Sequence, residues 1–241
     1  MLKERAWMNY VKRAIIMAAG YGSRMYPLTK TIPKPLISVN GIRMIDSIID
    51  ALHQNDICEI YVVVGYMKEQ FYEWADAHKH VKIIENPYYK ECNNISSLYV
   101  AREYIEDAII IDGDQMIYNP KVLFREFTNS GYNVVWQDTY TKEWILQLDD
   151  GIVTSCSRDG GQKGYRLYGI SRWTSADGKK LKNHLEREFI AKKHTDIYWD
   201  DVALFCYPDE YRLGVYEMNY NDVVEIDSID ELIAIDGSYE R

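Results

Sequence analysis

Cysteine is scarce in this sequence and follows no metal-binding or disulfide-rich pattern. The four cysteines among 241 residues are isolated from one another, without a Cys-x-x-Cys pair: they are Cys58, Cys92, Cys156 and Cys206. Zinc sites and small disulfide-stabilised folds both rely on closely spaced cysteines. The pattern therefore argues against both classes and predicts a cytoplasmic protein, because a reducing compartment keeps isolated thiols free.

Long hydrophobic runs are absent as well. No apolar stretch reaches the roughly 18 residues that a membrane-spanning helix requires, so no membrane span is expected. Residues 1–12, MLKERAWMNYVK, form a leader that is too polar for a signal peptide. This leader could be a short helix, a remnant of cloning or the end of a removed upstream domain, and the sequence does not separate these alternatives.

Positive charge and phenylalanine are both in deficit. The net charge is −9 and the isoelectric point is near 5.1, which argues against nucleic acid or an anionic membrane as partner. Five phenylalanines stand against 21 tyrosines and six tryptophans. Aromatic side chains with a polar tip suit half-buried edges, pocket walls and interfaces. The oligomeric state stays open, with a homodimer as one alternative.

Apolar strands alternate with amphipathic helices in the first half of the chain, which predicts an α/β fold with a mostly parallel sheet covered by helices on both faces. The second half has shorter, more alternating strands and the hairpin signal Asp149-Asp150-Gly151. We therefore expect one domain over residues 13–241, with a change of character near residue 130. The expected helices are 44–52, 68–78, 95–105, 120–128, 175–193 and 228–235, and the expected strands are 15–17, 59–66, 81–85, 108–111, 133–138, 144–148, 152–155, 165–173, 211–217 and 223–226.

A glycine-rich loop follows the first strand. The segment AAGYGSR, residues 18–24, lets the backbone pass close to a ligand because Gly20 and Gly22 have no Cβ. Free N–H groups in such a turn bind phosphate oxygens. Residue 25 is not the third glycine of a dinucleotide fingerprint, and no Gly-Lys-Ser/Thr follows, so two familiar phosphate loops are excluded. The remaining alternative is a glycine-rich turn without a ligand.

Basic residues surround this loop. Between residues 12 and 45 there are six lysines and arginines and no acidic residue, which predicts a focused anion site in an acidic protein. Arg24 adds a planar fork of donors, and Lys34, held between two prolines, adds a point charge.

Carboxylates follow two other strands. Asp112-Gly113-Asp114 ends an apolar strand, and Asp227 ends the strand Val223–Ile226. Ligands of open α/β sheets bind beyond the carboxyl ends of the strands. Acidic groups beside bound phosphates require a cation, so Asp114 and Asp227 are predicted ligands of Mg²⁺, and Asp112 ranks below Asp114. The alternative for Asp227 is a helix N-cap supported by Glu231.

The loop AAGYGSR, followed by PKPL, resembles the signature of sugar-nucleotide pyrophosphorylases and related nucleotidyltransferases. The resemblance implies a Rossmann-like nucleotidyltransferase fold, a loop that wraps the triphosphate of an NTP, and Lys34 and Arg24 as catalytic residues near the α-phosphate. It also implies an Asp at position 114 and an Asp or Asn at position 227 as ligands of the catalytic metal. The implied nucleotide-binding residues are Ala18, Ala19, Gly20, Tyr21, Gly22, Ser23, Arg24, Gly65, Tyr66 and Ser97, with Asp112 beside them.

Further blocks are similar to bacterial CTP:phosphocholine cytidylyltransferases: VGYMKEQF at 64–71, Asn93-Asn94 with Ser97-Leu98-Tyr99, YWD at 198–200 and EIDS at 225–228. The resemblance implies the reaction of CTP with phosphocholine to give CDP-choline and pyrophosphate, and a division into a nucleotide-binding part (13–130) and a small acceptor-binding subdomain (131–241). The alternative acceptors are 2-aminoethylphosphonate, phosphoethanolamine or a sugar 1-phosphate.

The chemistry of a quaternary ammonium agrees with this resemblance. Such a group is bound by aromatic faces and nearby carboxylates, because it cannot donate a hydrogen bond. The cluster Tyr198-Trp199-Asp200-Asp201 offers both kinds of side chain. The predicted acceptor-binding residues are Trp144, Tyr198, Trp199, Asp200 and Asp201. The alternative is that Trp199 belongs to the core and that the two aspartates form a solvated turn.

Overall fold

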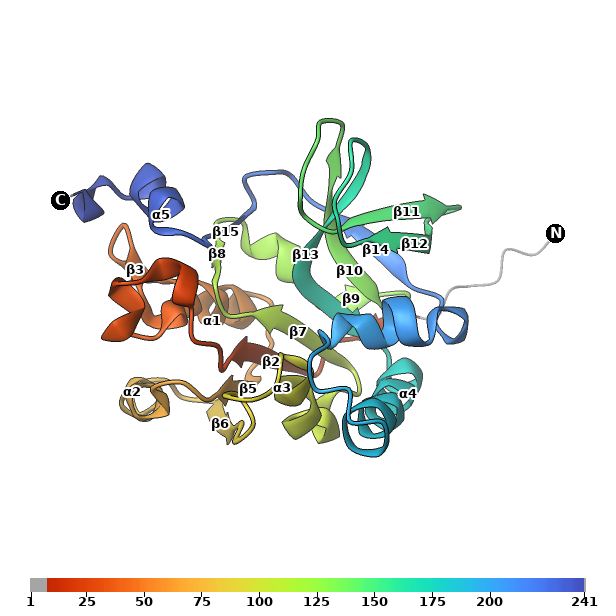
Figure 1. Ribbon diagram of the computed structural model, residues 1–241, viewed down its shortest axis with the longest axis horizontal. Helices are drawn as coiled ribbons and strands as arrows, with labels where there is room; N and C mark the ends of the chain where they lie inside the picture. Colours follow the sequence, from red (N-terminus) through yellow and green to blue (C-terminus); the bar gives the residue numbers. More distant parts are fainter. Residues whose placement is uncertain (1–7, 241) are drawn as a thin grey trace.

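The structure of the protein is a computed structural model that describes residues 8–240. A nine-stranded mixed sheet runs through its centre in the order β10-β14-β12-β11-β13-β7-β2-β5-β6 (Figure 1). Four neighbouring strands are parallel: β7 (Ala108–Asp112), β2 (Arg13–Ala18), β5 (Glu59–Val64) and β6 (Val81–Glu85). This part confirms the predicted α/β fold with a parallel sheet.

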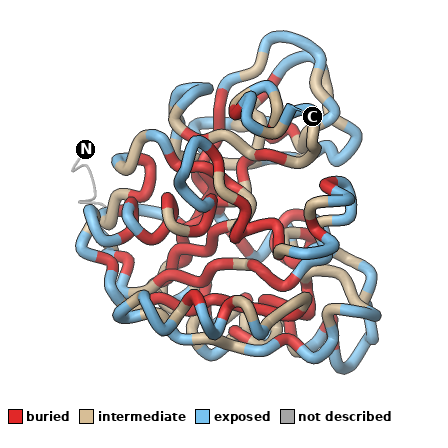
Figure 2. Tube along the Cα trace, turned by 90° about the vertical axis from the view of Figure 1, so that its left-hand side faces the viewer, coloured by how far each residue is buried: buried red, intermediate tan, exposed pale blue. Residues whose placement is uncertain are grey.

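The parallel strands are buried on both faces because alternate residues enter different cores. Ile16 and Val62 pack with α1 (Met44–Gln54) and α2 (Lys68–Ala75) on one face. Ile15 and Val63, one position away on the same strands, pack on the other face with α3 (Ile95–Val100) and α4 (Ser175–Glu186). This is the period of two of a strand applied to a continuous apolar run. Figure 2 shows these buried segments in red at the centre of the fold.

The second half of the chain extends the same sheet. β13 (Gly164–Trp173) pairs antiparallel with β7 and joins the two halves. β11 (Ile145–Asp149) and β12 (Ile152–Ser157) form the predicted hairpin, in which Asp150 and Gly151 both have positive φ, 47° and 74°. The sheet is completed by β10 (Gly131–Gln137) and β14 (Gly214–Glu217).

Two short strands carry the end of the chain back to the centre. β8 (Gln115–Ile117) pairs antiparallel with β15 (Val223–Glu225), and α5 (Ile229–Ile235) follows. The pairing sets Gln115 opposite Glu225, so the residues just outside it, Asp114 and Asp227, come close together. A third small pair is formed by β3 (Ser38–Val39) and β4 (Ile42–Arg43).

Several local expectations need correction. Residues 120–128 are not a helix: a short 3-10 turn, Pro120–Leu123, is followed by β9 (Glu126–Phe127). β9 pairs with β1 (Asn9–Tyr10), and the side chain of Val11 is fully buried. Residues 8–12 of the expected leader therefore pack onto the domain, and residues 1–7 lie outside the described part. The sequence could not show this pairing, because the two strands are more than 100 residues apart.

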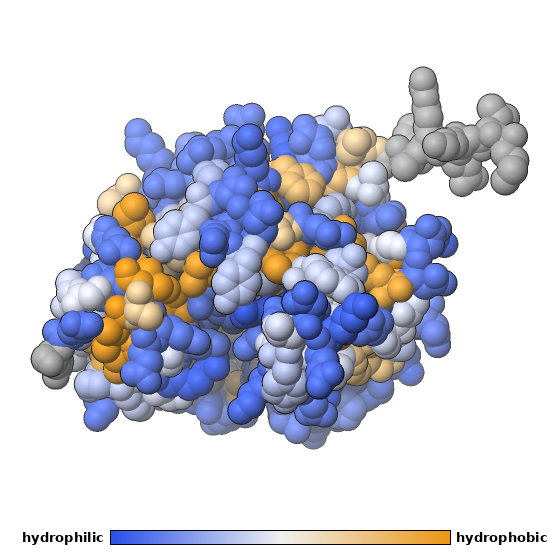
Figure 3. Space-filling view, turned by 90° about the horizontal axis from the view of Figure 1, so that it is seen from above, coloured by the Kyte–Doolittle hydropathy of each residue, from blue (hydrophilic) through white to orange (hydrophobic). Residues whose placement is uncertain are grey.

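Three expected helices are shorter than predicted. The expected helix 95–105 stops as an α-helix at Val100, and a 3-10 turn, Arg102–Tyr104, continues it. α4 continues as one wide turn, Arg187–Ala191, rather than to residue 193, and α2 ends at Ala75 rather than 78. Across residues 8–240, no helix combines the length and apolar character needed to cross a bilayer. The face seen from above is mostly hydrophilic, with apolar side chains in separate groups (Figure 3).

Candidate active site

A cavity of about 840 Å³ lies at the carboxyl ends of the parallel strands. Both halves of the chain contribute to its lining. The lining includes the glycine-rich loop with Lys34 (the predicted nucleotide end), Trp144 with Tyr198 (the predicted acceptor end) and a group of carboxylates. The lining includes these residues of the predicted site: Ala18, Ala19, Gly20, Tyr21, Gly22, Ser23, Arg24, Lys34, Ser97, Asp112, Asp114, Trp144, Tyr198, Asp200 and Asp227.

The conformation of the loop depends on Gly22. Its backbone is left-handed, with φ 60° and ψ 34°, and it precedes a short 3-10 turn, Ser23–Met25. A Cβ at this position would lie 2.9 Å from Cβ of Lys34 and 3.0 Å from Cγ2 of Thr29. The Thr29 hydroxyl donates a 2.8 Å hydrogen bond to the Gly22 carbonyl. The loop is thus packed directly on the stem of Lys34, which only glycine permits.

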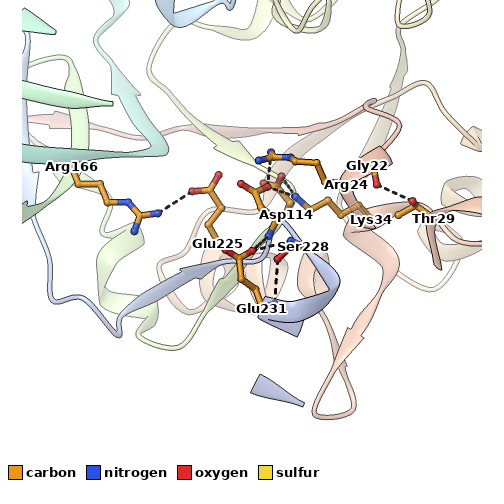
Figure 4. A network of polar contacts seen from close by, with 10 residues as sticks. Gly22, Arg24, Thr29, Lys34, Asp114, Arg166, Glu225, Ser228 and Glu231 are labelled. Atoms are coloured by element: carbon orange, nitrogen blue, oxygen red, sulfur yellow. Dashed lines mark hydrogen bonds and ion pairs between the residues drawn. The ribbon is translucent and has the colours of Figure 1, made fainter. Parts of the chain in front are cut away.

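Lys34 joins the loop to the carboxylates. Its Nζ donates to Oδ2 of Asp114 and to Oδ1 of Asp227, both at 2.7 Å, and Nη2 of Arg24 lies 2.8 Å from the same Asp227 oxygen. Lys34 is only 7% exposed. Burial lowers the pKa of Lys34, but the two carboxylates more than offset this, so its pKa is raised and the ammonium stays charged. Figure 4 shows Arg24, Lys34 and Asp114 pointing toward one another.

A third carboxylate, which the sequence reasoning missed, completes this group. Oxygen atoms of Asp114, Glu225 and Asp227 all lie within 4.8 Å of one another. Burial, together with the charges of the neighbouring Asp114 and Asp227, raises the pKa of Glu225 to about 8. Arg166 approaches Glu225 from the far side at 3.7 Å (Figure 4). The signal in the sequence is the spacing Glu-x-Asp on a strand, since residues two apart face the same side.

The turn after β15 leaves Asp227 free to face the cavity. The N-cap of α5 is Ser228, whose side chain accepts from the N–H of Glu231 at 3.2 Å. The Glu231 carboxylate in turn accepts from the N–H groups of Asp227 and Ser228, at 2.7 and 2.9 Å. This reciprocal capping box replaces the alternative in which Asp227 itself caps the helix. Asp227 therefore keeps both carboxylate oxygens for Lys34, Arg24 and a ligand.

Asp112 lines the same cavity. Its carboxylate packs on Gly169, where an added Cβ would stand 2.0 Å from Oδ2 of Asp112. Burial, followed by the charges of Asp114, Asp200 and Glu225, raises the pKa of Asp112 well above its usual range. Gly169 of β13 thus makes the room that a buried carboxylic group needs at the centre of the site.

The nucleotide end differs from expectation at two residues. Gly65 and Tyr66 do not line the cavity. The Tyr66 hydroxyl donates to the carbonyl of Thr29 at 2.8 Å, and its ring packs on Tyr21 at 4.9 Å between centroids. A Cβ at Gly65 would lie 2.6 Å from Cγ of Tyr89. Tyr89 covers Gly65 and lines the cavity in its place.

Ser97 does line the nucleotide end, and a buried amide fixes it. Asn86, which is 2% exposed, donates to the hydroxyls of Ser96 and Ser97 at 2.9 and 3.0 Å. The sequence reasoning missed Asn86 and Tyr89, and the stretch Asn86-Pro87-Tyr88-Tyr89 after β6 is the signal, because it also follows a parallel strand.

Two side chains of the predicted acceptor site face the cavity from the Tyr198–Asp201 turn. Tyr198 lies edge-to-face with Trp144, with ring centroids 5.6 Å apart and planes at 86°. Oδ1 of Asp200 is buried and has no hydrogen-bond partner among the described residues. Burial raises the pKa of Asp200 to about 7; Tyr132 lowers it and Asp201 raises it.

The other two side chains of this turn face away, and the expectation for them is wrong. Trp199 is 2% exposed and packs in the core between Tyr132 and Trp173, with centroids at 6.2 and 6.0 Å. Asp201 is also buried and accepts a 2.9 Å hydrogen bond from the N–H of Tyr198. Successive residues of the turn alternate between the cavity and the core, which composition alone does not reveal.

Comparison with known proteins agrees with this geometry. The family model described as nucleotidyl transferase matches residues 13–139. The chain is 37% identical over 228 residues to a 2-aminoethylphosphonate cytidylyltransferase of Lancefieldella rimae, covering 94% of this chain and 92% of the relative. It is 32% identical over 223 residues to a choline-phosphate cytidylyltransferase of Streptococcus pneumoniae, covering 91% and 94%.

Solved structures show the same fold. The CTP:phosphocholine cytidylyltransferase of Streptococcus pneumoniae aligns with a TM-score of 0.85 at 30% identity, over 95% of this chain and 99% of that one. An inositol-1-phosphate CTP transferase of T. maritima aligns with a TM-score of 0.77 at 20% identity, over 97% and 96%, which supports the fold alone. The phosphate loop, the lysine and the facing carboxylates, together with these matches, lead to one conclusion: the chain belongs to the nucleotidyltransferase family.

Proposed function

We propose that this protein is a cytidylyltransferase that transfers CMP from CTP to a small phosphate or phosphonate bearing a cationic nitrogen. The observation that carries the proposal is one cavity lined by two chemically different groups of side chains, which we assign to two ends. The end with the loop, Lys34 and Arg24 suits a triphosphate, and the end with Trp144, Tyr198 and Asp200 suits a cation. The acceptor phosphate would then meet the nucleotide between these ends.

The transfer needs little acid–base chemistry from the protein. A phosphate or phosphonate oxygen of the acceptor attacks the α-phosphorus of CTP, and the bond from that phosphorus to the bridging oxygen breaks as pyrophosphate leaves. The acceptor oxygen is already ionised near neutral pH, so no general base is required. Lys34 and Arg24 hold the phosphates and neutralise the charge that develops on them, so that catalysis rests on position and electrostatics.

The three carboxylates fit a divalent cation such as Mg²⁺. Asp114, Glu225 and Asp227 supply oxygen ligands within 4.8 Å of one another, and Oδ1 of Asp114 is buried without a partner among the described residues. When bound there, Mg²⁺ would supply charge neutralisation for the phosphates.

The acceptor that we favour is 2-aminoethylphosphonate. With Trp199 in the core, two aromatic rings remain at the acceptor end, beside the carboxylates of Glu143 and Asp200. A primary ammonium has three N–H donors for such carboxylates, including the unpartnered Oδ1 of Asp200. The relative from Lancefieldella rimae supports the same acceptor.

Phosphocholine is the second candidate. The edge-to-face pair of Trp144 and Tyr198 offers aromatic surface to a trimethylammonium group. The high structural similarity to the pneumococcal enzyme supports this acceptor.

Pyrophosphate release with CTP and Mg²⁺ tests the proposal. We expect turnover with acceptors that bear a cationic nitrogen, such as 2-aminoethylphosphonate or phosphocholine, and much less with glucose 1-phosphate or with UTP in place of CTP. Trp144→Ala should raise KM for the acceptor, whereas Trp136→Ala should not, because Trp136 is 47% exposed and lies outside the cavity. Preference for the sugar phosphate, or equal effects of the two substitutions, would contradict the proposed acceptor end.

A further inference from the structure

We propose that Arg158 is a positioning residue that holds the acceptor end of the cavity in shape from behind, through Asp201. This inference rests on the proposed function, because it concerns how the acceptor is bound. Arg158 follows β12 and does not line the cavity. It acts on Trp144 and Tyr198, which do.

Asp201 is the first link. Its side chain is 3% exposed, and its Oδ2 accepts the backbone N–H of Tyr198 at 2.9 Å. Its Oδ1 lies 2.5 Å from Nη2 of Arg158, which is its one ion-pair partner within residues 8–240. A buried carboxylate without a cation is costly. Removal of Arg158 would therefore release the turn that presents Tyr198.

Trp144 is the second link. The guanidinium of Arg158 lies 4.0 Å from the ring centroid of Phe205 and 5.6 Å from that of Trp144. Trp144 packs edge-to-face on both Phe205 and Tyr198, at 5.7 and 5.6 Å. One planar cation thus contacts two aromatic rings and one carboxylate, in the way that arginine, but not lysine, can.

The contacts join two parts of the chain. Trp144 directly precedes β11 and Arg158 directly follows β12, at the open end of one hairpin. Asp201 and Phe205 belong to the turn and short helix after residue 197. Trp144 meets this segment through its ring contacts with Tyr198 and Phe205, and Arg158 adds the ion pair with Asp201. Arg158 therefore supports both acceptor-facing rings at once, Trp144 by its guanidinium and Tyr198 through Asp201.

Steady-state kinetics of Arg158→Ala and Arg158→Lys test the inference. We expect KM for the acceptor to rise by about tenfold or more in Arg158→Ala, since small displacements of binding groups are costly. KM for CTP should stay within about twofold, because the nucleotide end is untouched. The acceptor KM of Arg158→Lys should lie between those of the wild type and Arg158→Ala, because lysine keeps the charge for Asp201 but loses the planar contact with the rings.

Arg102→Ala is the matched control. Arg102 also pairs with a carboxylate, Glu186 at 2.8 Å, and lies 4.1 Å over the ring of Tyr99, away from the cavity. Arg102→Ala should lower the thermal stability, but it should leave both the KM for the acceptor and the KM for CTP unchanged. An unchanged acceptor KM in folded Arg158→Ala, or equal rises in both KM values, would overturn the inference.

A second readout does not depend on turnover. The contribution of Trp144 to the near-ultraviolet circular dichroism is the difference between a protein and the same protein carrying Trp144→Phe. We expect this difference spectrum to change when both members of the pair carry Arg158→Ala, and to stay the same when both carry Arg102→Ala. If the wild type turns over neither acceptor, the proposed function fails, and this spectrum alone decides the positioning role: no change means that Arg158 does not hold Trp144.

Discussion

Lys34 is the residue whose removal tests the electrostatics of the site most sharply. In Lys34→Met the ammonium between Asp114 and Asp227 is lost, while the aliphatic stem that packs on Gly22 is largely kept. Asp227 retains Arg24 at 2.8 Å, but Asp114 has no other cationic partner among the described ion pairs. We expect the variant to be clearly less stable than the wild type when divalent cations are removed.

The magnitude follows from the geometry. Two carboxylates within 4.8 Å repel each other by about 3 kcal/mol at an effective dielectric constant of roughly 20. Breaking a buried ion pair by removing one partner costs about 3–5 kcal/mol. Because Asp114 and Asp227 keep 26% and 20% side-chain exposure, we take the lower end, about 3 kcal/mol. For a protein of this size that corresponds to a Tm lower by about 6–12 °C.

Thermal unfolding in EDTA and in Mg²⁺ is the assay. Mg²⁺ should stabilise Lys34→Met more than the wild type, since the variant has more uncompensated carboxylate charge. Lys12→Met is the control: Lys12 pairs with Asp107 at the same 2.7 Å but is 60% exposed, so its loss should cost at most about 1 kcal/mol. If both variants melt alike in EDTA, or if Mg²⁺ stabilises Lys34→Met no more than the wild type, the reasoning is wrong.

Three further predictions concern the loop, the acceptor end and the turn beyond α4. Gly22→Ala should raise KM for CTP by about tenfold or more, because the new Cβ meets Lys34 at 2.9 Å; Gly41→Ala, also at positive φ but in open space, should not, and equal KM values would argue against the loop as the CTP site. Burial raises the pKa of Asp200 to about 7, and the titratable groups that face it are Tyr132, Asp201 and Asp112. The ionised form of Asp200, which attracts the acceptor cation, therefore appears as the pH rises through this value. KM for the acceptor should therefore fall by about tenfold between pH 6 and 8, and Asp200→Asn should lose that part of the pH profile; an identical profile in the variant would exclude Asp200. Burial opposes ionisation of Glu188, but hydrogen bonds from Lys192, Tyr207 and His194 outweigh it and lower the pKa of this carboxyl. Its stabilisation is present above the unfolded pKa of about 4.3 and is lost as the pH falls through the folded value, so Glu188→Gln should be less stable than the wild type by about 1–3 kcal/mol at pH 7; chemical denaturation at pH 7 and pH 3.5 should show the gap narrowing, and a constant gap would contradict this origin.

The sequence was informative where chemistry and strand periodicity coincide. The loop after β2, Asp114 and Asp227 each follow from a residue type placed at or just beyond an apolar strand, and Lys34 follows from the basic cluster around the loop. The structure brings all of them into one cavity. The parallel strands were predictable for the same reason, since they are continuous apolar runs. Alternate residues of a strand point to opposite faces of the sheet, so the same runs also predict one hydrophobic core on each face.

Long-range pairing set the limit of that reasoning. The sequence Asn119-Pro120 is a typical helix start, which predicted a helix over residues 120–128. In the structure Glu126–Phe127 instead pairs as a strand with Asn9–Tyr10. In the Tyr198–Asp201 turn, the sequence shows aromatic and acidic side chains without showing which of them face the cavity. Trp199 instead stacks on Tyr132 and packs edge-to-face against Trp173 in the core, and both partners come from strands elsewhere in the chain.

The central claim is cytidylyl transfer to an acceptor with a cationic nitrogen, and a competition experiment tests it most directly. The wild type is incubated with CTP, Mg²⁺ and equal concentrations of 2-aminoethylphosphonate, phosphocholine and glucose 1-phosphate, and the products are separated by phosphorus NMR. The account predicts pyrophosphate together with a CMP–phosphonate as the main product, with CDP-choline second. A nucleotide sugar as the main product, or hydrolysis of CTP without any transfer, would contradict it.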